Sequence, residues 1–245
     1  MTQTSGLVVG AGRGIGLEFV RQLLHSDRYA RVYATYRNPQ SELWAIDDSR
    51  LTCLPMDITD ETQIADAVRK IQAEATALHI AVNCVGVLHE GEMQPEKSLR
   101  HLNSEQLLRY FQVNSIGPVL LTKHLQPLLK HGDRAVLATI SAKVGSIGDN
   151  ALGGWYGYRA SKAALNMFLR SAAIEYKRTC PRTIVALLHP GTTDTELSRP
   201  FQRSVPSDKL FSVDRTVQQL LAVLDNLEEK DSGGFFSWDG SLLPW

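Results

Sequence analysis

Short apolar runs rich in β-branched residues alternate along this chain with longer segments of helical periodicity. The first run, Gly6–Gly10, is followed by Ile15–Leu24, where apolar residues recur every three or four positions. Strands that alternate with helices predict parallel βαβ units, whose crossovers are nearly always right-handed. We therefore expect an α/β fold, a doubly wound parallel sheet with helices on both faces. Its ligand crevice would lie at the carboxyl ends of the strands.

The same pattern places the remaining elements and gives about seven strands. Further strands are expected at 31–36, 51–56, 79–85, 135–141 and 183–188, with an edge strand in the closing segment GGFFSWDG. Helices are expected at 61–75 after an Asp60 N-cap, at 104–130 with an interruption at Gly117-Pro118, at 158–178 and at 213–227. No repeat or interior linker divides the chain, so we expect a single domain over 1–245 with a possible substrate lid within 192–212.

Composition excludes several classes of function. The 26 basic side chains equal the 26 acidic ones, so no global field favours nucleic acid or an anionic membrane. No apolar run approaches the ~18 residues of a membrane span, and the N-terminus does not resemble a signal peptide. The three cysteines are scattered and the histidines dispersed, so we expect a reducing, cytoplasmic location and no metal site.

Four glycines lie where the first strand gives way to the first helix. They are Gly10, Gly12, Gly14 and Gly16. No Gly-Lys-Ser/Thr follows, so this is not a P-loop, and Ile15 breaks the GxGxxG pattern. Glycines allow positive φ and a close backbone approach, and a helix N-terminus attracts an anion. The loop thus predicts an anion at the crevice without specifying a dinucleotide; the alternative is a tight turn with incidental glycines.

Two arginines suggest which anion this is. The second strand ends in Tyr36-Arg37 without a carboxylate, and Arg13 lies within the glycine loop. A carboxylate at this point suits a ribose 2′-hydroxyl, whereas arginine suits a 2′-phosphate. NADP(H) is therefore favoured over NAD(H), unless both arginines are ordinary surface residues.

Tyr158 and Lys162 lie four residues apart in a segment of helical periodicity. That spacing places both side chains on one helix face. A free tyrosine has a pKa near ~10, and a neighbouring ammonium would lower it by stabilising the phenolate. Alone, such a pair is common on protein surfaces.

Taken together, these residues resemble the short-chain dehydrogenase/reductase family, nearly end to end and in the family's order. The resemblance implies a Rossmann-like fold and a set of site residues. The matching segments are Gly10-x-x-x-Gly14-x-Gly16, with Gly12, Arg13 and Ile15 inside it, for the cofactor loop; Asp57-Ile58 for the adenine contact; Asn83-Cys84-Val85-Gly86 for Asn-Asn-Ala-Gly; Asn114 for the proton relay; Tyr158-x-x-x-Lys162 for the active-site signature; and Pro190-Gly191-Thr192 for the nicotinamide contact.

Within the family, GSIGDN, GGWYGYRASKAALN, HPGTTDTELSRPF and SGGFFSWDGSLLPW resemble the sniffer and C-factor group. This implies an NADPH-dependent oxidoreductase that reduces an aldehyde, ketone or dicarbonyl. Tyr158 would donate the proton, Lys162 would hold the cofactor ribose and lower the tyrosine pKa, and Asn114 would anchor a relay water. The family's usual packing implies a homodimer or homotetramer through the helices at 104–130 and 158–178.

One departure concerns the family's Ser-Ser pair, which is Ser141-Ala142 here. The second serine normally polarises the carbonyl, and Ala142 has no hydroxyl. Neighbours on a strand point to opposite faces, so Ser141 remains a candidate only with a bulge or rearrangement, beside Ser146 and a bound water. Losing one oxyanion donor costs on the order of 10²–10³ in rate. A C-factor-like signalling or regulatory protein with vestigial catalysis is therefore the alternative, and a non-redox use such as dehydration or epimerisation is a third.

Overall fold

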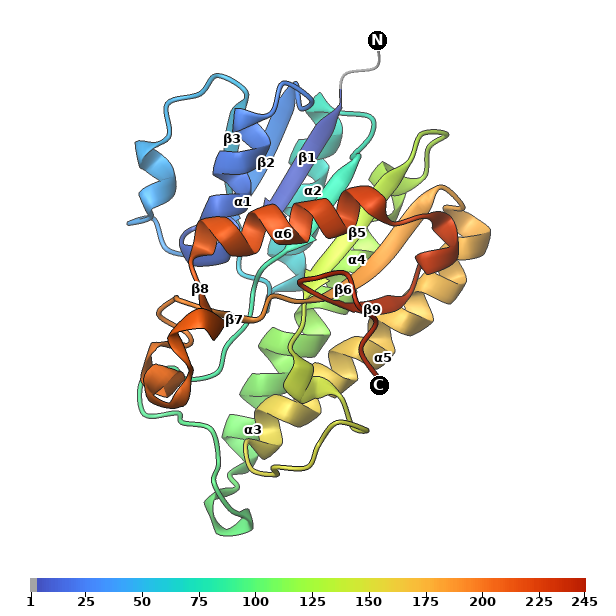
Figure 1. The fold of residues 1–245 in the computed structure, drawn as a ribbon. Helices are drawn as coiled ribbons and strands as arrows, with labels where there is room; N and C mark the ends of the chain where they lie inside the picture. The colour runs from blue at the N-terminus through green and yellow to red at the C-terminus, as the bar shows by residue number, and fades with distance from the viewer. Residues whose placement is uncertain (1–3) are drawn as a thin grey trace.

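The computed structural model describes residues 4–245, so the first three residues of the predicted domain lie outside the described part. Seven parallel strands form one sheet in the order β3-β2-β1-β4-β5-β6-β9 (Figure 1). The order reverses between β1 and β4, as expected of a doubly wound sheet. The strands are β1 (Ser5–Val9), β2 (Arg31–Tyr36), β3 (Leu51–Pro55), β4 (Ile80–Asn83), β5 (Ala135–Ile140), β6 (Thr183–His189) and β9 (Gly234–Ser237).

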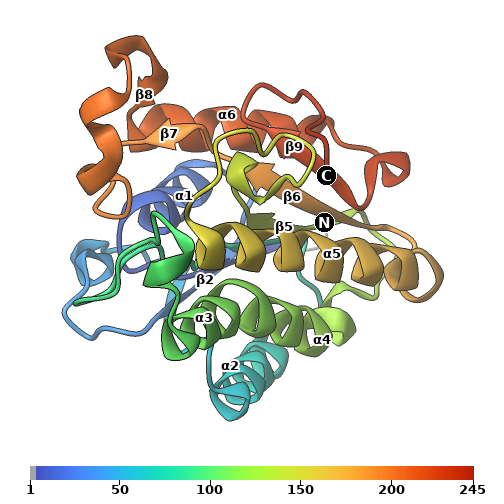
Figure 2. The ribbon, with the colours of Figure 1, turned by 90° about the horizontal axis from the view of Figure 1, so that it is seen from below.

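Helices cover both faces of the sheet, as the sequence predicts (Figure 2). α1 (Gly14–His25) and α6 (Val213–Asn226) pack on one face. α2 (Glu61–Glu74), α4 (Gly117–Leu129) and α5 (Tyr156–Thr179) pack on the other, and α3 (Ser104–Phe111) lies against α5. Each face holds its own apolar core, because the central strands are buried on both sides.

The expected interruption at Gly117-Pro118 is misplaced. The helix passes through these residues, and the irregularity is a π-helical turn just before them, at Gln112–Ile116. Pro118 has no N–H to donate in an α-helical ladder, and the wider turn leaves it at the start of α4, where none is needed. Gly117 lets α4 pack closely on the segment after β3, because a Cβ there would lie 2.5 Å from the Ile58 carbonyl oxygen.

The predicted lid region begins and ends in a short second sheet. β7 (Thr192–Thr193) pairs in parallel with β8 (Leu210–Phe211), and two 3₁₀ turns at Arg199–Ser204 and Ser207–Lys209 lie between them. In Figure 1 this segment stands apart from the main sheet, beyond the carboxyl ends of its strands. Among the described residues, no helix is both long and apolar enough to cross a membrane.

The Asp60 N-cap is confirmed and gives a test of local stability. Its carboxylate accepts hydrogen bonds from the Thr62 and Gln63 amides at 2.9 and 3.2 Å. Replacing an N-cap aspartate with alanine typically costs ~1 kcal/mol. We expect Asp60→Ala to lower the free energy of unfolding by about 1 kcal/mol, measured as a lower urea midpoint with an unchanged m-value. An unchanged midpoint would mean that solvent replaces the cap without loss.

Candidate functional site

The glycine loop forms the turn from β1 into α1, and three of its glycines are required by geometry. Gly10 and Gly14 have φ values of +77° and +54°. A Cβ at Gly16 would lie 2.2 Å from the Gly10 carbonyl oxygen, so no other residue fits. The N-cap residue of α1, Arg13, makes no side-chain capping bond. The first turn of α1 therefore presents backbone amides and the positive end of the helix dipole to an anion.

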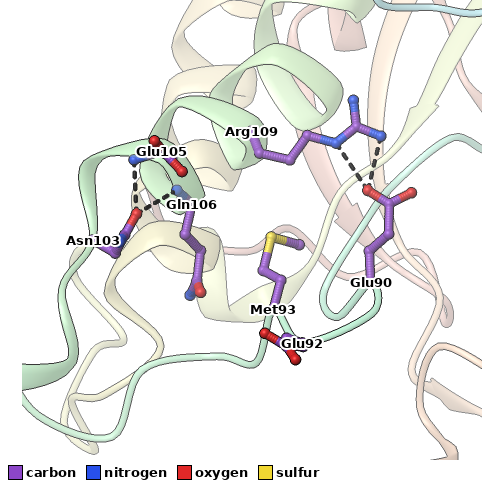
Figure 3. A pocket seen from close by; sticks show the side chains of 7 residues that line it. All are labelled: Glu90, Glu92, Met93, Asn103, Glu105, Gln106 and Arg109. Atoms are coloured by element: carbon purple, nitrogen blue, oxygen red, sulfur yellow. Dashed lines mark hydrogen bonds and ion pairs between the residues drawn. The ribbon is translucent and has the colours of Figure 1, made fainter.

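Each of the two predicted phosphate-binding arginines contacts a carboxylate of its own. Arg13 pairs with Glu196, a residue of the predicted lid. Arg37 pairs with Glu90 at 3.3 Å, and Glu90 also binds Arg109 at 2.8 Å (Figure 3). Neither carboxylate is predicted by the sequence pattern, because they approach from segments 183 and 53 residues away.

A hollow of about 440 Å³ lies beside Glu90, between the loop that follows β4 and the start of α3 (Figure 3). Its lining is acidic and amide-rich: Glu90, Glu92, Met93, Asn103, Glu105, Gln106 and Arg109. Neither the glycine loop nor Tyr158 contributes to it, so this hollow is separate from the predicted chemistry.

Asp57 and Ile58 follow β3 as the resemblance requires. The Asp57 carboxylate accepts hydrogen bonds from the Thr59 amide and hydroxyl at 2.9 and 2.7 Å. Burial alone would raise the pKa of Asp57, but the hydrogen bonds from Thr59 and the nearby charges of Arg37 and Arg109 outweigh burial. The pKa of Asp57 is therefore lowered, and its carboxylate is ionised at neutral pH. Ile58 is buried.

The Asn83-Cys84-Val85 segment leaves β4 directly beside the glycine turn. The Asn83 side-chain oxygen accepts from the Val85 amide at 3.1 Å, while its buried Nδ2 has no partner among the described residues. A Cβ at Gly10 would lie 2.7 Å from the Val85 side chain. Burial raises the pKa of the Cys84 thiol, which therefore stays protonated.

The structure brings Tyr158 and Lys162 together in the first turns of α5. The Tyr158 ring lies edge-on to Trp155 and Tyr110, with both centroid distances at 6.2 Å. The Lys162 ammonium lies 5.9 Å from the Tyr158 ring centroid and donates to the Ile140 carbonyl at 3.0 Å. Both side chains are more than nine-tenths buried.

Asn114 joins this pair from the π-helical turn. Its side-chain oxygen accepts from the Val87 amide at 2.8 Å, and its Nδ2 donates to the Val87 carbonyl at 2.9 Å and to Ser161 Oγ at 3.0 Å. A Cβ at Gly86 would lie 3.4 Å from Lys162 Nζ and 3.6 Å from the Asn114 oxygen. Gly86 therefore separates the lysine from the asparagine.

Without a bound ligand, burial is the main influence on the charges of Lys162 and Tyr158. It lowers the pKa of Lys162 to about 8 and raises that of Tyr158. The phenol is thus neutral at pH 7 and the lysine is close to its titration point. Such a displaced pair in a protein interior is typical of functional sites.

Ser141 and Ala142 point to different surroundings, as alternation along a strand predicts. The buried Ser141 hydroxyl donates to Asn166 Oδ1 at 2.7 Å. Ala142 packs with the cluster that contains Tyr158. The Ser146 hydroxyl accepts from the Asp149 amide at 3.1 Å. The residue that packs against the cluster of the tyrosine is therefore one without a hydroxyl.

Pro190, Gly191 and Thr192 follow β6 at the same edge of the sheet. Gly191 has a φ of +72°, and a Cβ there would lie 2.7 Å from the Phe211 ring. Thr192 opens β7 and so begins the segment predicted as a lid.

That segment contacts both halves of the site. At one end, Thr195 lies against Gly14, with its Cγ2 3.5 Å from where a Cβ would be. At the other, the Phe201 ring lies 4.9 Å from the Trp155 ring, centroid to centroid. His89 lies within 3.2 Å of the Glu196 carbonyl.

Three potential metal ligands meet at the opposite edge of the sheet, which sequence spacing did not predict. His79, His131 and Asp133 place one ligand atom each within 4.8 Å of the others. However, His79 Nδ1 accepts a hydrogen bond from the Ser5 amide, which leaves the proton of the neutral ring on Nε2, facing Asp133 at 3.8 Å. That tautomer opposes metal binding.

The buried ammonium gives a test that needs no ligand. Between pH 8 and 10.5 the unfolded chain keeps the Lys162 proton while the folded protein releases it, so stability rises with pH through this window. The pKa difference corresponds to roughly 3 kcal/mol. We therefore compare the free energy of unfolding of the parent protein with that of Lys162→Met at each pH. From pH 7.5 to 10, we expect the parent to gain about 1–3 kcal/mol over the variant. Lys70→Met, at an exposed position, is the control; a constant difference between Lys162→Met and the parent would contradict the lowered pKa.

Several known proteins resemble this chain in fold and in sequence. The NADPH-bound carbonyl reductase from chicken fatty liver has 30% identity and a TM-score of 0.87, with 100% of both chains covered. The carbonyl reductase Sniffer of D. melanogaster has 26% identity and a TM-score of 0.86, again over 100% of both chains. C-signal of Myxococcus xanthus is 34% identical over 149 residues, which are 60% of this chain and 84% of that protein.

The family model for short chain dehydrogenases matches residues 6–205. This span includes the glycine loop, Asn114, the Tyr158/Lys162 pair and Pro190-Gly191. The chain belongs to the short-chain dehydrogenase/reductase family and is an oxidoreductase of its sniffer and C-factor-like group.

Proposed function

We propose that this protein reduces the carbonyl group of an aldehyde, ketone or dicarbonyl, with NADPH as cofactor. The observation that carries the proposal is the buried assembly of Tyr158, Lys162 and Asn114 at the carboxyl edge of the sheet, next to a glycine turn built for an anion. The NADPH-bound carbonyl reductase among its structural relatives supports both the reaction class and the cofactor.

The residues at the crevice fit a dinucleotide. The uncapped first turn of α1 and the glycines around it suit a diphosphate. The unpartnered Nδ2 of Asn83 offers a buried donor close to the turn. Asp57 and Ile58 would hold the adenine side, and Pro190-Gly191-Thr192 the nicotinamide side. Arg13 and Arg37 would bind a 2′-phosphate by exchanging Glu196 and Glu90 for it.

When bound, NADPH supplies the hydride, and this chain's own residues handle the proton. The phenol of Tyr158 is protonated at neutral pH and would donate to the carbonyl oxygen, although burial, which raises its pKa, makes it a weaker acid in the protein alone. The Lys162 ammonium then stabilises the phenolate that forms. Asn114, fixed by Val87 and Ser161, would hold the water through which Lys162 exchanges protons with solvent.

The group that polarises the carbonyl differs from the family pattern. Ala142 offers none, and the Ser141 hydroxyl already donates to Asn166. We propose that Ser141 supports α5 through this bond, and that Tyr158 or a bound water takes the polarising role. A rate lower by on the order of 10²–10³ than with a serine donor is expected.

Ala142 also favours a second candidate function, a cofactor-binding signalling protein with weak catalysis. The similarity to C-signal supports it. NADPH binding without turnover across a broad panel of aldehydes, ketones and dicarbonyls would favour this candidate.

We further propose a single cytoplasmic domain over residues 1–245, with 192–212 as its substrate lid, that assembles into a homodimer or homotetramer. The predicted interface helices support the assembly. Leu165 and Leu169 are buried in the core, whereas Met167, Phe168 and Ile174 of α5 and Leu108 of α3 are exposed apolar side chains. Exposed apolar groups of this size on adjoining helices suit a subunit contact.

Tyr158→Phe tests the proton donor. Removing the hydroxyl leaves no acid at the carbonyl oxygen, and we expect kcat to fall by about 10²–10⁴ on the best-accepted member of the carbonyl panel. NADPH affinity, measured by fluorescence titration, should change little. Turnover at the parent rate would mean that another group donates the proton.

Arg37→Ala and Arg13→Ala test the cofactor preference. A hydrogen bond to a charged group is worth about 1.5–3 kcal/mol, so each substitution should weaken NADPH binding by roughly 10- to 100-fold. NADH binding should barely change. Equal losses for both cofactors would contradict a 2′-phosphate site at these arginines.

A further inference from the structure

The start of α5 carries Tyr158, yet its own N-cap residue supplies no capping bond. That residue, Trp155, has a left-handed backbone with φ 51° and ψ 42° and makes no side-chain cap. It is the one non-glycine residue with positive φ in the described part of the chain. A bulky residue held in this conformation is strained by about 1–3 kcal/mol and persists only where its surroundings enforce it.

A carboxylate from elsewhere in the chain takes the capping place. Glu96, in the loop between β4 and α3, accepts a hydrogen bond from the Gly157 amide at 3.1 Å through Oε2. Its backbone carbonyl accepts from the Trp155 amide at 2.5 Å. Glu96 therefore accepts hydrogen bonds from Trp155 and Gly157, the residues on either side of the first α5 residue. Tyr158 follows directly.

The environment of Glu96 is unusual for an acidic side chain. It is 2% exposed, and no basic group within the described residues forms an ion pair with it. Buried glutamates are rare unless paired. Here the positive end of the α5 dipole and the Gly157 amide take the place of a cation.

The second oxygen of Glu96 is fixed from α3. Gln106 Nε2 donates to Oε1 at 3.0 Å and to the Gln94 carbonyl at 2.8 Å. Gln106 is itself held in the first turn of α3, where the Asn103 side chain accepts from its amide at 3.2 Å (Figure 3). A continuous chain of hydrogen bonds thus runs from the cap of α3 to the start of α5.

Gly157 makes this approach possible. A Cβ there would lie 2.9 Å from Glu96 Oε1 and 2.4 Å from the Tyr110 ring. Tyr110 in turn lies edge-on to Tyr158. The fit around residue 157 therefore couples the position of the Glu96 carboxylate to that of the tyrosine ring.

We propose that Glu96 is a positioning residue for Tyr158: it caps α5 from outside the helix and sets the place of the phenol hydroxyl. This rests on the proposed role of Tyr158 as proton donor. Glu96 itself touches the helix start and has no part in proton transfer.

Glu96→Ala and Glu96→Gln, with Asp60→Ala as matched control, test the proposal. Asp60 is also a carboxylate cap, but it is the N-cap residue of α2 itself, accepts from two amides and does not contact the tyrosine. We expect Glu96→Ala to lower kcat by about 10- to 100-fold, as small misplacements of a catalytic group do. NADPH affinity and the KM of the carbonyl substrate should stay unchanged. Glu96→Gln keeps an oxygen for the Gly157 amide but turns its NH2 toward the Gln106 NH2, so its kcat should lie between those of Glu96→Ala and the parent. Asp60→Ala should retain all of the parent kcat at saturating NADPH.

Three outcomes would overturn the proposal. One is a Glu96→Ala protein with the parent kcat and only a lowered melting temperature, as for Asp60→Ala. Another is a loss of kcat matched by weaker NADPH binding, and the third is an equal loss in Glu96→Gln. If Glu96→Ala does not fold, Glu96→Asp decides, because the carboxylate is withdrawn by one methylene; a reduced kcat supports the proposal and the parent kcat overturns it.

Failure of the proposed function has a different signature. The parent protein would then turn over no carbonyl, or Tyr158→Phe would be as active as the parent. Hydrogen exchange still tests the cap in that case. Amides of the first α5 turn should exchange faster in Glu96→Ala than in the parent, with no change at α2, and unchanged exchange would overturn the proposal.

Discussion

The candidate site depends on an ammonium group buried where β5, α5 and the loop after β4 meet. Lys162 is 2% exposed and donates to the carbonyl of Ile140, the last residue of β5. Gly86 lies directly against its Nζ, and a Cβ at Gly145 would lie 2.7 Å from its own Cβ. Since a buried charge is tolerated only where polar partners are fixed around it, these contacts constrain how α5 lies on the sheet.

The packing of α5 on the sheet also places the other side chains that α5 carries. With α5 held on β5, the Tyr158 ring lies edge-on to Tyr110 and Trp155, and the Ser161 hydroxyl accepts a hydrogen bond from Asn114 in the π-helical turn. Asn166, on the same helix, accepts the hydrogen bond that the Ser141 hydroxyl donates. The Ser141 proton is therefore engaged there and not with Tyr158. The hydroxyl of Ser141, the neighbour of Ala142 in the chain just after β5, therefore does not replace the one that Ala142 lacks.

Local signals in the sequence predicted most of the fold. β2 begins and ends where the apolar run does, and the Asp60 cap forms with amides two and three residues ahead. Tyr158 and Lys162 were predicted because their spacing is a property of one helix. The π-helical turn was missed because its hydrogen-bond register depends on packing against the segment after β3, through Gly117 and Ile58.

Carboxylates that act across the fold had no such signal. Glu96 meets Gly157 over 61 residues, and Glu196 meets Arg13 over 183. In sequence each is one acidic residue among 26 acidic side chains, in a polar loop. Only the tertiary structure shows that one is buried against a helix start while the other neutralises an arginine at the crevice. The cofactor preference and the tyrosine placement that we propose thus rest on contacts that periodicity and spacing do not encode.

Hydride transfer itself is tested most directly by a single turnover with NADPH deuterated at the transferable C4 position. The protein, an accepted carbonyl compound and the labelled cofactor would be mixed, and the product analysed by mass spectrometry. We predict one deuterium on the carbinol carbon of the alcohol that the parent protein forms, and a strongly slowed reaction in Tyr158→Phe. Product without deuterium, or tight NADPH binding with no product from any member of the panel, would contradict it.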